Sequence, residues 1–112
     1  TYADSMAAGC VVEAPVSTVL ADGMAVRRAD PQALTILQAG LDRVVQVSDT
    51  QVAQAMRDLY TDTHNLAEGA GAASFAAAWA DRDQLKGLQV GTTLCGGNVD
   101  TALFCDVLKK HF

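Results

Sequence analysis

The chain has 112 residues, which is enough for one domain or part of one, and a domain of this size can bury about two-thirds of its unfolded surface. Hydrophobic residues make up 50% of the chain but aromatic residues only 5%, so a core must be built from Ala, Val and Leu and requires close approach of backbones. The net charge is −5 and the only basic clusters are Arg27-Arg28 and Lys109-Lys110, which argues against nucleic acid as a partner.

The cysteine usage and the lack of long apolar runs argue against three further classes of protein: disulfide-rich, zinc-binding and membrane proteins. Cys10, Cys95 and Cys105 are three in number and have no C-x-x-C spacing, which disfavours a disulfide framework or a zinc site and favours a reducing, cytoplasmic setting. No run approaches the roughly 18 apolar residues of a membrane span, and no signal peptide is visible, so we expect no membrane partner. The chain opens at Thr1 without an initiator Met, and we therefore expect a piece of a longer protein.

The N-terminal half is predicted to contain two helices and two extended segments. Residues 3–8 resemble the end of a helix that Gly9 terminates, and residues 10–13 form a short extended candidate. Asp30 followed by Pro31 places a cap before a proline at the first helical position. The β-branched residues 44–47 then predict a strand.

The clearest helix signal follows directly. Ser48, with Gln51 three residues later, has the form of a capping box. Apolar residues then fall at positions i, i+3, i+4, i+7 and i+8, namely Val52, Ala55, Met56, Leu59 and Tyr60. This pattern predicts an amphipathic helix with Met56 and Tyr60 in the core rather than in contact with a cofactor.

Residues 65–80 are almost all small. Alanine favours a helix, whereas a glycine inside one costs about 1 kcal/mol, so we expect Gly69 and Gly71 at the helix entry with Glu68 at or before the cap. Phe75 and Trp79 are spaced i and i+4 and are expected to anchor the buried face of this helix.

The last part of the chain is predicted to form a buried strand, a tight turn and a helix. The strand covers residues 88–94, and Cys95 with two glycines makes the turn. Asn98 or Asp100 caps the helix that follows, whose apolar stripe is Leu103, Phe104, Val107 and Leu108. The alternation of strands and helices along the chain predicts an α/β fold with some parallel strands.

Two side chains are candidates for contact with a ligand. Cys95 lies at the carboxyl end of the predicted strand, where open α/β sheets bind ligands, although a buried structural thiol is the alternative. Glu68 lies in an otherwise uncharged stretch, either as a helix N-terminal charge or as a group facing a ligand. His64 and His111 are in no metal-ligand spacing, so we expect neither a metal site nor histidine catalysis. No P-loop, G-x-G-x-x-G, H-E-x-x-H or G-x-S-x-G motif occurs, and the residues alone predict only an α/β segment with a ligand-facing turn.

Four motifs, in order and covering nearly the whole chain, resemble the threonine/serine dehydratases. Residues 18–26 (T-V-L-A-D-G-M-A-V) are similar to the family's T-I-A-D-G-x-A-V, and residues 44–49 (V-V-Q-V-S-D) to its V-x-V-S-D. Residues 67–73 (A-E-G-A-G-A-A) are similar to its E-G/P-A-G-A-A, and residues 95–98 (C-G-G-N) to its S-G-G-N. These enzymes use pyridoxal phosphate and have fold type II, the fold of tryptophan synthase β. The resemblance implies an α/β fold, part of a large domain in which helices flank a parallel-rich sheet.

The resemblance also implies three cofactor-binding residues. Cys95 takes the place of the Ser that hydrogen-bonds the pyridine nitrogen of pyridoxal phosphate, Glu68 matches a carboxylate near the cofactor ring, and Gly23 matches a turn whose backbone passes the active site. A neutral partner leaves the ring nitrogen less protonated than a carboxylate would, which suits β-elimination.

Other parts that the family requires do not occur in these residues. The Schiff-base lysine lies in an S-x-K-x-R-like motif and the phosphate on a G-G-G-G-L-like loop, and the contexts of Lys86, Lys109 and Lys110 match neither. The family's divalent-metal site also lies upstream. We therefore expect residues 1–112 to be the C-terminal segment of a catalytic domain that holds no catalytic residue of its own and is inactive alone.

The activity implied for the complete protein is a lyase reaction. It converts L-threonine or L-serine to a 2-keto acid and ammonia. Serine racemase and hydroxyaspartate dehydratase share every motif quoted, and a non-catalytic α/β binding or assembly module is the alternative from another class. The partners implied are a small amino-acid substrate, the remainder of the same catalytic domain and further copies in a homo-oligomer.

Overall fold

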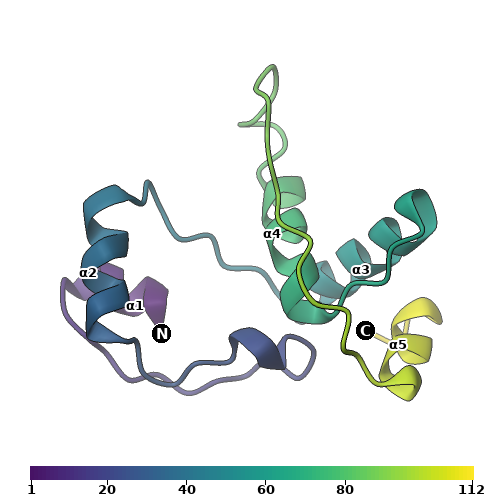
Figure 1. Ribbon diagram of the computed structural model, residues 1–112, viewed down its shortest axis with the longest axis horizontal. Coiled ribbons are helices and arrows are strands. Elements are labelled where there is room, and N and C mark those ends of the chain that lie inside the picture. The colour runs from purple at the N-terminus through teal and green to yellow at the C-terminus, as the bar shows by residue number, and fades with distance from the viewer. The chain divides into compact units, whose positions relative to one another are not determined.

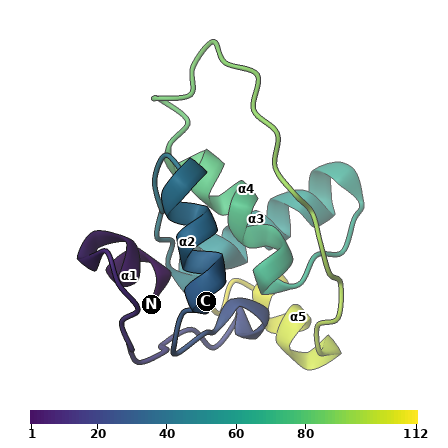
Figure 2. The ribbon, with the colours of Figure 1, turned by 60° about the vertical axis from the view of Figure 1, so that its left-hand side comes forward.

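The computed structural model describes residues 1–112 and contains five α-helices and one short 3-10 helix, η1 (Asp22–Met24). The backbone forms two compact units. One comprises Thr1–Ser17 and Ala25–Gln46, and the other comprises Thr18–Met24 and Val47–Phe112. Figures 1 and 2 show the helices and the long connections without regular structure that join them. None of the helices has the combination of length and apolar content that crossing a bilayer requires.

The first unit holds the two N-terminal helices. α1 (Tyr2–Ala8) ends at Gly9, whose φ of 71° is the left-handed conformation that glycine adopts without strain, as the sequence predicts. α2 (Pro31–Gly40) begins after Asp30, whose carboxylate accepts a hydrogen bond from the Ala33 N–H at 2.8 Å. The predicted cap and proline start are therefore confirmed.

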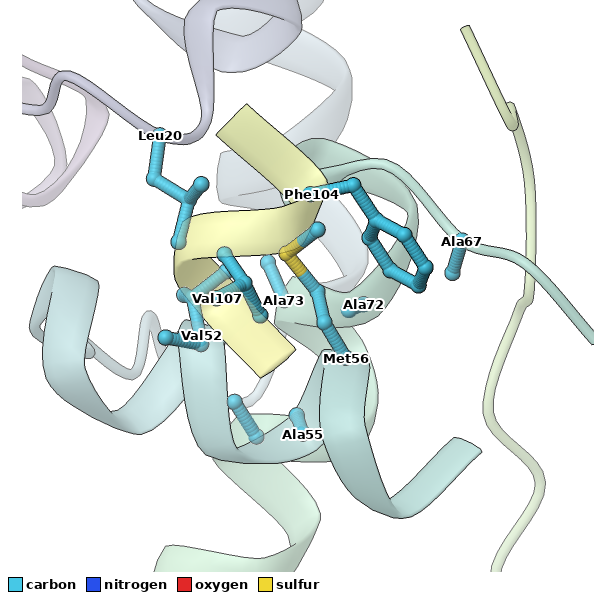
Figure 3. Close-up of a cluster of buried hydrophobic side chains, with 11 residues drawn as sticks. Leu20, Val52, Ala55, Met56, Ala67, Ala72, Ala73, Phe104 and Val107 are labelled. Atoms are coloured by element: carbon cyan, nitrogen blue, oxygen red, sulfur yellow. The ribbon is translucent and has the colours of Figure 1, made fainter. Parts of the chain in front are cut away.

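The second unit is built on α3 (Asp49–Thr63), which carries the predicted capping box. The Gln51 N–H donates to Ser48 Oγ at 3.3 Å, and the Ser48 N–H donates to Gln51 Oε1 at 2.8 Å. Met56 is fully buried, as predicted, and Figure 3 shows its side chain beside Phe104. Tyr60 is 42% exposed, which corrects its assignment to the core, although its ring meets Phe104 edge-on at 5.3 Å.

α4 (Gly69–Ala80) packs against α3, and α5 (Thr101–Leu108) also contacts α3. The glycines lie at the entry of α4 with Glu68 as its N-cap, as predicted. The face of α4 that joins the core is made of alanines. Large side chains from α3 and α5 fill the remaining space. The buried cluster is Leu20, Val52, Ala53, Ala55, Met56, Ala67, Ala72, Ala73, Ala76, Phe104 and Val107.

The predicted role of the α4 aromatics is wrong in part. Phe75 is half-buried against the core, but Trp79 is 56% exposed. Because Ala72 and Ala76 form the packed face, the aromatic pair falls at its edge. In α5, Phe104 and Val107 are buried as expected, whereas Leu108 is 38% exposed.

The three predicted strands do not form within these residues. Segments 10–13, 44–47 and 88–94 contain no strand, and the sole β feature is an isolated antiparallel bridge between Glu13 and Arg28. A strand is stable only when its backbone N–H and C=O groups pair with a neighbouring strand, and none of these runs pairs with another. The parallel strands that the alternation predicts, and the parallel-rich sheet that the family resemblance implies, are therefore not seen in this chain.

Candidate cofactor site

The turn of residues 95–98 is held by Glu68 at the N-cap of α4. The Glu68 N–H donates to the Gly96 carbonyl at 3.1 Å, and Glu68 Oε2 accepts from the Asn98 N–H at 3.2 Å. Gly96 has a φ of 71°, and a Cβ there would lie 2.3 Å from Glu68 Oε1. Only glycine satisfies both the positive φ and this close approach of the carboxylate.

Because Gly69 and Gly71 have no side chains, the backbones of two other segments pack directly against the entry of α4. A Cβ on Gly71 would lie 1.8 Å from the Cys95 carbonyl oxygen, and one on Gly69 would lie 2.2 Å from the Leu20 carbonyl oxygen. The loop of residues 18–24 and the turn of residues 95–98 therefore both pack directly on the start of α4. The glycines that are costly inside a helix are required here by close packing.

Gly23 and the turn that begins at Cys95 both border the Glu68 carboxylate. A Cβ on Gly23 would lie 3.5 Å from Glu68 Oε1, so the η1 turn borders this group directly. Glu68 is half-buried, and Cys95 is a free, exposed cysteine. The exposure of Cys95 corrects the alternative of a buried structural thiol.

Two further residues support this site, and the sequence reasoning assigned neither of them. Asp49 accepts a hydrogen bond from the Thr18 hydroxyl and another from the Val19 N–H at 2.8 Å. Thr18 and Asp49 both lie inside motifs that carry the family resemblance, which is the only signal the sequence offers for them. Their contact joins positions 31 residues apart, so no local pattern reveals it.

A separate hollow lies between α3 and the end of α4. Its volume is about 120 Å³, and Gln54, Phe75, Trp79 and Arg82 are among its lining residues. The Arg82 guanidinium carbon lies 5.3 Å from the centre of the Trp79 ring, a cation–π distance. This hollow contains none of the predicted cofactor-binding residues. No group of three His, Cys, Asp or Glu side chains is arranged to hold a metal ion.

The two glycine-containing turns and the N-cap of α4, at which they meet, lie in three of the four motifs described above. The family described as "Pyridoxal-phosphate dependent enzyme" matches residues 1–96, and the chain belongs to this family. Pyridoxal phosphate is therefore the cofactor of the family to which the chain belongs.

Three proteins similar to this chain are an L-threonine ammonia-lyase, a threonine deaminase and a serine racemase. The L-threonine ammonia-lyase of Geobacter sulfurreducens is 36% identical over 107 residues, which are 95% of this chain and 26% of that protein. Among solved structures, a threonine deaminase from T.th. matches with a TM-score of 0.79 and 29% identity, covering 88% of this chain and 33% of that one. Maize serine racemase matches with a TM-score of 0.81 and 28% identity, covering 99% of this chain and 36% of that one.

These likenesses place the chain in the α/β class, although its own residues form helices and a single β-bridge. The chain spans between 26% and 36% of the length of these three relatives.

The exposed Cys95 thiol, next to the turn that Glu68 holds, is the group whose chemistry suits the ring of pyridoxal phosphate. The missing side chains of Gly96 and Gly97 serve packing, because a Cβ on Gly96 would lie 2.3 Å from Glu68 Oε1 and one on Gly97 would lie 3.2 Å from the Leu66 carbonyl oxygen. A thiol is a weak donor and acceptor, which suits contact with a pyridine nitrogen. The structure offers no lysine and no glycine-rich phosphate loop in this turn, so the fit extends to the ring edge alone.

Proposed function

We propose that the protein containing this chain is a pyridoxal phosphate-dependent ammonia-lyase. It converts L-threonine or L-serine to a 2-keto acid and ammonia, and residues 1–112 form the C-terminal segment of its catalytic domain. The observation that carries the proposal is the convergence of Gly23, Glu68 and the Cys95 turn around one carboxylate. The names of the relatives support the choice of substrate.

Each of the three residues has a distinct proposed role. Cys95 contacts the ring nitrogen as a neutral partner, and Glu68 fixes the turn that presents Cys95. Gly23 borders the same carboxylate and keeps the η1 turn free of a side chain. When bound, the cofactor supplies an electron sink for the carbon from which a proton is removed. A neutral partner of the ring nitrogen limits that sink and thereby favours loss of the β-hydroxyl group.

The remaining parts of the proposal concern the whole protein. The lysine that binds the cofactor and the loop that holds its phosphate belong to the remainder of the catalytic domain. The protein acts in the cytoplasm as a homo-oligomer. The cysteine usage supports the cytoplasmic location, and the family resemblance supports the other statements. Gel filtration of the natural polypeptide tests the oligomeric state.

The first experiment is a visible absorbance scan of the natural polypeptide that carries this chain, with added pyridoxal phosphate. A cofactor band that shifts when L-threonine or L-serine is added supports the proposal. Release of a 2-keto acid then identifies a lyase, whereas formation of D-serine identifies a racemase and loss of ammonia from hydroxyaspartate identifies the third candidate. No band from a polypeptide that contains the cofactor lysine contradicts the proposal and favours a non-catalytic binding module.

Substitution of Cys95 tests its role within the same assay. Cys95→Ser replaces one small neutral partner by another, so we expect turnover within about threefold of wild type. Cys95→Asp places a carboxylate beside the ring nitrogen and promotes its protonation, so we expect turnover to fall by about tenfold or more. Cys105→Asp, at an exposed cysteine of α5, is the matched control. Full turnover of Cys95→Asp contradicts the assigned role.

A further inference from the structure

Asp49 makes two contacts with a loop that precedes it by about 30 residues. It is the first residue of α3, and its Oδ1 accepts a hydrogen bond from the Thr18 hydroxyl. Its second oxygen, Oδ2, accepts from the Val19 N–H at 2.8 Å. Both carboxylate oxygens are therefore committed to the loop of residues 18–24.

The Thr18 hydroxyl extends this contact into the loop. Its oxygen accepts from the Ala21 N–H at 3.0 Å while its hydrogen is donated to Asp49, as the one donor and two acceptor positions of a hydroxyl allow. The Ala21 carbonyl in turn accepts from the Met24 N–H at 3.0 Å, which closes the η1 turn around Gly23. A continuous set of hydrogen bonds thus runs from Asp49 to the turn that contains Gly23.

The loop held in this way is the one that packs on the entry of α4. Leu20 is 4% exposed in the core, and its carbonyl oxygen occupies the position that a Cβ on Gly69 would need. Gly23 faces Ala70 and the Glu68 carboxylate. A shift of the loop would therefore open the space beside Glu68 and the Cys95 turn.

We propose that Asp49 is a positioning residue of the cofactor site, acting through Thr18. Its carboxylate fixes the loop of residues 18–24 against Gly69 and Glu68, and it touches neither substrate nor cofactor. The identity of the group that the loop borders rests on the function proposed above. A favourable charge at the helix N-terminus explains an acidic residue at this position. It does not explain why both oxygens of Asp49 bind a loop distant in sequence.

The test uses the natural polypeptide with substitutions on both sides of the contact. Asp49→Asn keeps one acceptor and removes the other, and Thr18→Val removes the hydroxyl at nearly constant shape. Thr18→Ser restores the hydroxyl. Ser48→Ala is the matched control, because it removes the capping box at the same end of α3 without touching the loop.

The first readout does not require the cofactor. We expect amide hydrogen exchange at Val19 and Ala21 to become about tenfold faster in Asp49→Asn and in Thr18→Val, and to stay near the wild-type rate in Thr18→Ser and Ser48→Ala. The effect of the double variant should be smaller than the two single effects combined, because both changes affect the same hydrogen bond between Thr18 and Asp49. Unchanged exchange in Asp49→Asn overturns the proposal.

The second readout is the Kd of pyridoxal phosphate, measured from the absorbance of the bound cofactor. Asp49→Asn and Thr18→Val are expected to raise this Kd about tenfold, and Ser48→Ala to leave it within about twofold even where it lowers the melting temperature equally. An equal rise in Ser48→Ala overturns the positioning role. If the wild-type polypeptide binds no pyridoxal phosphate, the proposed function fails, and the exchange rates still decide whether Asp49 fixes the loop.

Discussion

Two segments adjoin the turn of residues 95–98, and they differ in burial: the entry of α4 is closely packed, whereas residues 88–94 are exposed. At the entry of α4, Gly69 and Gly71 are buried, and backbone atoms of two other segments occupy the space where their side chains would be. Residues 88–94 lead into the same turn, yet Leu88 is 65% exposed and Val90 49% exposed. The turn that carries Cys95 is therefore fixed by α4 and Glu68. The exposed run before it is held to α4 by the hydrogen bond that the Ser74 hydroxyl donates to the Thr93 carbonyl at 2.8 Å.

The largest expected effect is a glycine substitution that breaks this packing. Gly71→Ala introduces a methyl group where the Cys95 carbonyl oxygen lies, so it should lower the free energy of unfolding by about 3 kcal/mol, at the upper end of overpacking costs. Gly91→Ala is the control in the exposed run, since nothing lies within 4 Å of the added methyl group, and should change stability by less than about 0.5 kcal/mol. Urea unfolding of the natural polypeptide measures both changes in stability. Equal effects of the two substitutions would contradict the difference in packing between the entry of α4 and residues 88–94.

A smaller effect is expected from the carboxylate itself. Glu68→Ala removes the acceptor of the Asn98 N–H and the group that packs on Gly96, and should cost about 1–2 kcal/mol. Glu13→Ala removes an exposed ion pair with Arg28, whose side chains are 71% and 67% exposed, and should cost less than about 0.5 kcal/mol. The same unfolding measurement compares them. A Glu68 variant as stable as the Glu13 variant would show that Glu68 does not fix the turn.

The smallest effect is expected in the exposed run. Val90→Thr replaces a half-exposed methyl group by a hydroxyl, and should change the free energy of unfolding of this chain by less than about 0.5 kcal/mol. A loss of about 2 kcal/mol or more in the natural polypeptide would mean that Val90 is buried there, as in a strand at the centre of a sheet. In that case the difference in burial between the entry of α4 and residues 88–94 would hold only for the 112-residue chain.

Local signals account for the parts of the fold that could be predicted. The cap at Asp30 and the capping box at Ser48 each form within a few residues, so the sequence contains all that these helix starts require. The strand at residues 88–94 could not be predicted in the same way, because a strand depends on partners distant in sequence. The prediction for Trp79 is wrong because spacing alone does not tell which face of an alanine-rich helix packs.

The candidate site was predictable only through the resemblance. Gly23, Glu68 and Cys95 lie in separate motifs, and no periodicity brings them together before the chain folds. The approach of Gly23 and of the turn at residues 95–98 to the Glu68 carboxylate is a property of the packed structure. The contact between Thr18 and Asp49 lies outside any local pattern for the same reason.

The most direct test of the central claim is the alkylation of the three cysteines in the natural polypeptide, mapped by peptide mass with and without bound pyridoxal phosphate. Cys10, Cys95 and Cys105 are all free and exposed in this chain, so two of them serve as internal controls. If Cys95 lies at the cofactor ring, bound pyridoxal phosphate slows its alkylation by about tenfold and leaves the rates at Cys10 and Cys105 unchanged. Equal labelling of Cys95 with and without bound cofactor would contradict the assignment of this turn to the cofactor site.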